Sequence, residues 1–113
     1  MLAVAGLAIF NANSTGRAQT QGIDNDTYFI MLGTISKIRI ISENCGIQFD
    51  SRYDADFLTV LSEHSVDLKK ASEHLIKYYE NEKHNMGSEC YDGAKEHLAT
   101  LDKIYKTSLA DMQ

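Results

Sequence analysis

The sequence predicts an all-α protein, a small antiparallel bundle of about four helices closed by one disulfide bond. Three observations predict this fold class. The 113 residues contain no proline, a residue that would interrupt the interior of a helix. Apolar residues recur every three or four positions, which is the spacing of one helix face. The two cysteines, Cys45 and Cys90, fall at predicted helix ends that an antiparallel bundle brings together.

The N-terminal segment predicts export. Residues 2–10 form an uncharged, largely apolar run, shorter than the roughly 20 residues of a membrane-spanning helix. The run has the length of a signal-peptide hydrophobic region, although no Lys or Arg precedes Leu2. Gly16 and Ala18 supply the small residues expected before a cleavage site. We therefore expect a signal peptide over residues 1–18; the alternative is an uncleaved tail on a cytosolic protein.

Residues 19–113 are expected to form a single helical domain. The full chain carries 11 basic and 16 acidic residues, and loss of Arg17 with the leader would lower the net charge from −5 to −6. Nucleic acids and anionic membranes favour clusters of Lys and Arg, so neither is an expected partner. We expect a periplasmic or secreted protein with no stable membrane insertion after the leader is removed.

The first helix is predicted from Asp24 to Asn44. Asp24 or Asp26 can accept a backbone N–H at its start, and Gly46 can take the left-handed conformation that often ends a helix. Several isoleucines in this segment would also suit a strand, but its length and acidic start favour a helix. One face carries the apolar residues Tyr28, Met31, Leu32, Ile35, Ile38 and Ile41.

Two further helices are predicted in the middle of the chain. Asp54 is expected to cap one that runs to about Glu63, and Ser65 to cap another that ends at Met86 and Gly87. A single bent helix through this region is the alternative. The residues expected to face inward are Phe57, Leu58 and Leu61, followed by Leu68, Ala71, Leu75, Tyr79 and Met86.

The last helix is predicted to start at Ser88 and to fray over residues 110–113. Its apolar face carries Tyr91, Ala94, Leu98, Leu101, Tyr105 and Leu109, spaced by three and four. Cys45 and Cys90 would then lie at one end of the bundle and form a disulfide, which closes a loop of about 45 residues and stabilises the fold by roughly 4 kcal/mol. Two free thiols are the alternative in a cytosolic protein.

Four histidines, His64, His74, His84 and His97, are candidate functional residues. The first three are spaced by ten residues. On one helix this spacing turns His84 by about 80° from His74 and separates the two by about 15 Å along the axis. A metal site on a helix needs spacings of three or four, so no metal ligand is predicted. Histidines titrate near physiological pH, which makes these four candidate pH-sensing residues.

No catalytic or cofactor-binding residue is predicted. The chain lacks a Gly-x-Ser-x-Gly motif, a Cys-x-x-Cys pair and a phosphate-binding glycine loop. Tyr78 and Tyr79 are adjacent, so they cannot both face the core of a helix bundle. Tyrosine is common at protein interfaces, and the two residues are therefore a candidate interaction surface.

The expected function is protein–protein binding by a small exported helical protein, such as an inhibitor or an immunity-type protein. An acidic chain would suit a basic partner. One alternative is a pH-responsive chaperone of the bacterial envelope, suggested by the histidines. Another is a histidine-based metal-binding protein or enzyme.

Overall fold

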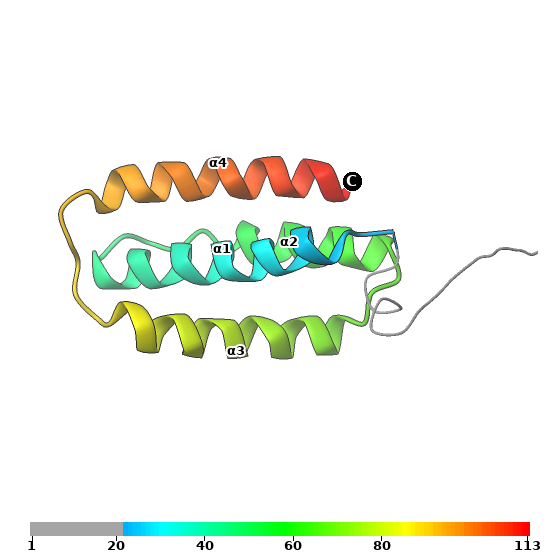
Figure 1. Cartoon of the computed structure of the whole chain (residues 1–113), viewed down its shortest axis with the longest axis horizontal. Coiled ribbons are helices and arrows are strands. Elements are labelled where there is room, and N and C mark those ends of the chain that lie inside the picture. Colours follow the sequence, from blue (N-terminus) through cyan, green and yellow to red (C-terminus); the bar gives the residue numbers. More distant parts are fainter. Residues whose placement is uncertain (1–21) are drawn as a thin grey trace, which may run out of the picture.

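The computed structural model describes residues 22–113, which form four α-helices and no strand within this range. The helices are α1 (Asn25–Asn44), α2 (Arg52–Glu63), α3 (Leu68–Met86) and α4 (Ala94–Met112). Consecutive helices run in opposite directions, and α3 and α4 lie on opposite sides of α1 and α2 (Figure 1). The predicted all-α bundle is confirmed. The predicted leader lies outside the described residues.

Helix α1 is the centre of the bundle and packs against the other three helices. Met31, Ile35, Ile40 and Ile41 are almost completely buried, although they point in different directions around the helix. The middle of α1 is therefore buried on more than one face, as expected of a helix with partners on several sides. This enclosure explains how a segment rich in isoleucine becomes a helix, because tertiary packing overrides a local preference for strand.

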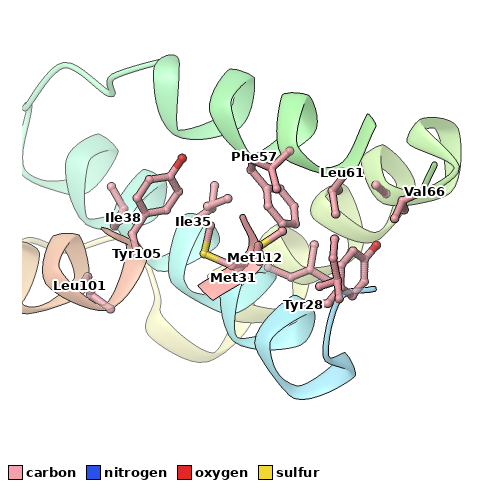
Figure 2. Packing of buried hydrophobic residues seen from close by; sticks show 14 of the residues in the cluster. Tyr28, Met31, Ile35, Ile38, Phe57, Leu61, Val66, Leu101, Tyr105 and Met112 are labelled. Carbon is pink, nitrogen blue, oxygen red and sulfur yellow. The ribbon is translucent and has the colours of Figure 1, made fainter. Parts of the chain in front are cut away.

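The other helices direct their apolar side chains toward α1. Phe57 of α2 and Tyr105 and Met112 of α4 surround Met31 and Ile35 of α1 (Figure 2). Burial of one such side chain contributes roughly 1.5–3 kcal/mol to the free energy of folding. None of the four described helices is long and apolar enough to cross a membrane.

The start of α1 is as predicted, whereas the caps of α2 and α3 differ from the prediction. The Asp24 carboxylate accepts the backbone N–H of Thr27 at 3.2 Å. Helix α2 begins two residues before Asp54, and the carboxylate of Asp50 accepts the Arg52 N–H instead. The prediction that Asp54 caps α2 is wrong, because its carboxylate instead accepts a hydrogen bond from Arg39 of α1.

Helices α2 and α3 are separate, which confirms the predicted division. The predicted cap Ser65 is wrong. Ser65 lies in the turn with a left-handed φ of 61°, and Asp67 caps α3 by accepting the N–H groups of Lys69 and Lys70. The helix ends at Met86, as predicted. Leu68, expected to face inward, is exposed in the first turn of α3.

The predicted start of α4 at Ser88 is wrong, because residues 87–93 form the connection from α3 and the helix begins at Ala94. Gly93, with a φ of 86°, precedes the helix and breaks the helical path. Tyr91 is therefore an exposed residue of the connection. The expected fraying is also not observed, since α4 continues to Met112, whose side chain is only 2% exposed.

Cys45 and Cys90 lie at disulfide distance, with their Cα atoms 4.8 Å apart. Cys45 directly follows α1, and Cys90 lies within the connection between α3 and α4 rather than at a helix start. The connection crosses the end of the bundle from one outer helix to the other (Figure 1). The bond therefore fastens this crossing to the end of the central helix, as the sequence predicts.

Candidate functional site

A half-open groove of about 550 Å³ lies between α2 and α3, with α1 as its floor. We call it the α2–α3 groove. Three helices supply its lining: Ile35, Ser36, Arg39 and Glu43 from α1, Asp54 and Leu58 from α2, and Ser72, Leu75, Ile76, Tyr79 and Glu80 from α3. Apolar side chains therefore form much of its surface, and ionisable groups stand at its edge.

The apolar wall of the groove belongs mainly to α3. Ile76 is 59% exposed, the largest exposure among the large hydrophobic side chains of the described residues. Helix α3 touches the bundle along a narrow stripe, and Ala71 is its one fully buried residue in the part of the chain described. The lateral face of α3 is thus left open beside α2, which is why an isoleucine is presented to solvent there.

Arg39 and Asp54 form an ion pair at the edge of the groove, and each side chain is about one third exposed. The Arg39 guanidinium also lies 4.1 Å from the centre of the Phe49 ring. These two contacts hold the arginine in one position. The second carboxylate oxygen of Asp54, Oδ1, is covered and accepts no hydrogen bond from any described residue.

Tyr79 links the α3 wall to the floor. Its hydroxyl donates a hydrogen bond to Glu43 Oε1 at 2.6 Å, and this bond raises the pKa of Tyr79 because the carboxylate favours the protonated phenol. Glu80 lies at the same edge. Three carboxylates, those of Glu43, Asp54 and Glu80, and one guanidinium therefore line the groove. This excess of negative charge favours a cation.

The two predicted interaction residues point to different places. Tyr79 lines the groove, whereas the Tyr78 ring stacks on Phe29 of α1, with ring centres 6.1 Å apart and planes 21° apart. Both tyrosines are half-buried. Phe29 and its neighbour Ile30 are 44% and 48% exposed, so a second apolar area lies near the start of α1.

Beneath Phe29, Tyr28 Oη and His74 Nδ1 lie 2.7 Å apart. Tyr28 is buried, and burial, with a smaller contribution from the neighbouring Tyr78, raises its pKa to about 12. The phenol therefore keeps its proton at neutral pH. It can donate this proton to Nδ1 when His74 carries its own proton on Nε2.

The other histidines lie apart from His74. His64 follows α2 and faces Gly22, His84 is exposed near the end of α3, and His97 contacts the Tyr91 hydroxyl in the first turn of α4. Residues 22–113 contain no group of three or more His, Cys, Asp or Glu side chains arranged to hold a metal ion. No observation in this range favours the metal-binding alternative.

A second polar network, between α2 and α4, has a structural role. The Tyr53 hydroxyl donates to Asp102 at 2.6 Å, and the Tyr105 hydroxyl donates to the Tyr53 carbonyl at 2.9 Å. The hydrogen bond from Tyr53, together with that from Lys106, lowers the pKa of Asp102. These hydrogen bonds join α2 to α4.

The sequence prediction missed the charged edge of the groove. Arg39 interrupts the isoleucines of the first helix, and a cation among buried residues was the available signal. From the sequence alone, its partner Asp54 is predicted to be a helix cap.

Comparison of the chain with protein-family models, curated proteins and solved structures finds no match. The function is therefore argued from the geometry of the groove and from the sequence.

Proposed function

We propose that this is a small exported protein that acts by binding another protein through the α2–α3 groove, as an inhibitor or immunity-type protein does. The observation that carries the proposal is the composition of the groove. An exposed apolar wall centred on Ile76 stands beside a charged edge formed by Asp54, Glu43 and Glu80. An apolar centre with a polar rim is the usual construction of a protein interface.

The proximity of Cys45 and Cys90 supports the export part of the proposal. Disulfide bonds persist in oxidising compartments such as the periplasm and the extracellular space. The hydrophobic N-terminal run and the small residues after it supply the matching sequence signal. The intact mass of the protein recovered from its host tests this part, because it reports both leader removal and loss of the two thiol hydrogens. A native chain with its leader and two thiols would contradict export.

Site-specific photo-crosslinking tests the binding part. A photoreactive amino acid replaces Ile76 in the groove, and a matched control places it at Ile104, an exposed isoleucine on α4 outside the groove. We expect a discrete crosslinked protein from the envelope or secreted fraction with the Ile76 probe, and its loss when Leu58→Glu is added. Equal labelling from both positions, or labelling from neither, would contradict the proposal.

A second candidate function is an acid-responsive chaperone, favoured by the contact between Tyr28 and His74. Protonated His74 carries a hydrogen on both ring nitrogens, so the Tyr28 hydroxyl can no longer donate to Nδ1, and the contact persists only if the phenol oxygen turns to accept. Phe29 and Tyr78 pack beside this contact, and its loss would loosen their stacking. Binding of a hydrophobic dye should then rise between about pH 7 and about pH 3, and should rise less in His74→Gln. A flat response would exclude this candidate.

A further inference from the structure

We infer that the occupant of the α2–α3 groove is one amphipathic α-helix of the partner protein, with apolar residues on one turn and a Lys or Arg about one turn away. This inference rests on the proposed function, since it assumes that the groove binds protein. It adds the secondary structure, the order of residue types and the charge of the bound segment.

The walls of the groove favour a helix as occupant. Three helices form the groove, and their backbone N–H and C=O groups are already paired within each helix. A bound extended strand would bury backbone groups that find no partner on such walls, at a cost of about 1–3 kcal/mol for each unsatisfied group. A helix satisfies its own backbone groups and needs only to place side chains in the groove.

The groove has dimensions that suit this occupant. Its lining on α3 extends from Ser72 to Glu80, and on α1 from Ile35 to Glu43. At a rise of 1.5 Å per residue, each of these spans is about 12 Å, or about two turns of a helix. A bound helix would therefore present about two turns of one face, which is the pattern of helix-in-groove recognition.

The charges and the apolar residues of the groove occupy different ends. Because α2 runs opposite to α1 and α3 (Figure 1), Asp54 near the start of α2 lies at the same end as Glu43 and Glu80, which come late in their helices. Toward the other end, each wall has an apolar residue one turn away, at Leu58 and Ile76. The groove is thus acidic toward the disulfide end and apolar toward the turn between α2 and α3.

This polarity determines the charge of the occupant. Arg39 is already engaged by Asp54 and by the ring of Phe49, so it is poorly placed to bind an anion. Glu80, by contrast, is an exposed carboxylate at the acidic end of the groove. A Lys or Arg side chain at the acidic end would donate to carboxylates there, whereas an acidic side chain would be repelled.

A displayed library of helical peptides tests the inference. The peptides are about 14 residues long, or roughly four turns, with randomised residues on one face, and are selected for binding to the intact disulfide-bonded protein. We expect enrichment of apolar residues at spacings of three and four, with Lys or Arg about one turn beyond. Enrichment of acidic or extended sequences would overturn the inference.

Variants then locate the bound peptide. Glu80→Gln should weaken binding of the enriched peptide about two- to fivefold, the range for an exposed charge pair. Glu73→Gln is the matched control, because Glu73 is an exposed carboxylate of the same helix outside the groove. Ile76→Glu should abolish binding. Equal effects of the two glutamine substitutions would overturn the assigned charge contact.

The crosslinking experiment separates this inference from the proposed function. If the library yields no enriched helix while the Ile76 probe captures a partner, the groove binds protein but its occupant is of another kind, and the inference fails alone. If the Ile76 probe also captures nothing beyond the Ile104 control, the proposed function itself fails.

Discussion

Tyr28 Oη lies 2.7 Å from His74 Nδ1, a contact that joins the first turn of the central helix to α3. Phe29, Phe57 and Tyr78 add ring contacts around it. Because α3 has few buried residues, this group of aromatic side chains is a main attachment of its N-terminal half to the bundle. Together with Ala71 and Leu75, it packs α3 against the bundle.

Tyr28→Phe should lower the free energy of unfolding by about 1 kcal/mol, since it removes one hydrogen bond and leaves His74 Nδ1 without its partner. Urea unfolding followed by circular dichroism measures the change. Tyr91→Phe is the matched control, because it removes an exposed tyrosine–histidine contact on the connection before α4. A loss as large for Tyr91→Phe as for Tyr28→Phe would contradict a special role for the Tyr28 contact.

Alkaline pH should destabilise the fold through its buried phenols. Burial raises the pKa of Tyr28 and of Tyr105 to about 12, and burial together with Asp102 raises that of Tyr53. The folded pKa lies above the unfolded value of about 10. The stabilising contribution is therefore complete below about pH 10 and is lost as the pH rises through about 12.

Urea midpoints between about pH 8 and pH 12, read beside the tyrosinate absorbance, measure this effect. We expect the midpoint to fall above about pH 10, and to fall less in the double variant Tyr28→Phe and Tyr105→Phe. Ionisation of all tyrosines near pH 10 with an unchanged midpoint would contradict the assigned burial.

How far the sequence predicts this fold depends on whether a feature is local. The cap at Asp24 and the end of the third helix follow from residue types in one short segment, and both are confirmed. The sequence predicts too early a start for α4, because Tyr91 lies three residues before Ala94 and so fits the spacing of the apolar face. The left-handed Gly93 interrupts the helix between them, and a single sequence does not reveal this.

The charged edge of the groove was harder to predict because it depends on tertiary packing. Arg39 and Asp54 are 15 positions apart and meet only because α2 folds back along α1. Tyr79 and Glu43 are 36 positions apart. Helical spacing alone assigns Asp54 equally well to a cap or to an ion pair, and the choice follows only from the packing of two helices.

Reduction of the disulfide should lower the free energy of unfolding by roughly 4 kcal/mol, the chain entropy of a loop of about 45 residues. The bond also holds the crossing between α3 and α4 against the end of α1. Urea unfolding of the oxidised protein, the reduced protein and the double variant Cys45→Ser and Cys90→Ser measures the loss. The reduced protein and the double variant should agree. An unchanged urea midpoint in both would show that the crossing is held by other contacts.

Two glycine substitutions should have opposite effects, because Gly33 and Gly46 differ in backbone conformation. Gly33 lies inside α1, and a Cβ added there meets no atom within 4 Å. Gly33→Ala should therefore raise the free energy of unfolding by about 0.5–1 kcal/mol, because alanine is the better helix former. An added Cβ at Gly46 also meets no atom within 4 Å, but a φ of 68° is strained for alanine. Gly46→Ala should therefore lower the free energy of unfolding by about 1 kcal/mol.

Thermal unfolding of the two variants, with the disulfide intact in both, measures the difference. A gain in stability from Gly46→Ala would contradict the left-handed turn that ends the central helix, and a loss from Gly33→Ala would show that this part of α1 approaches another backbone.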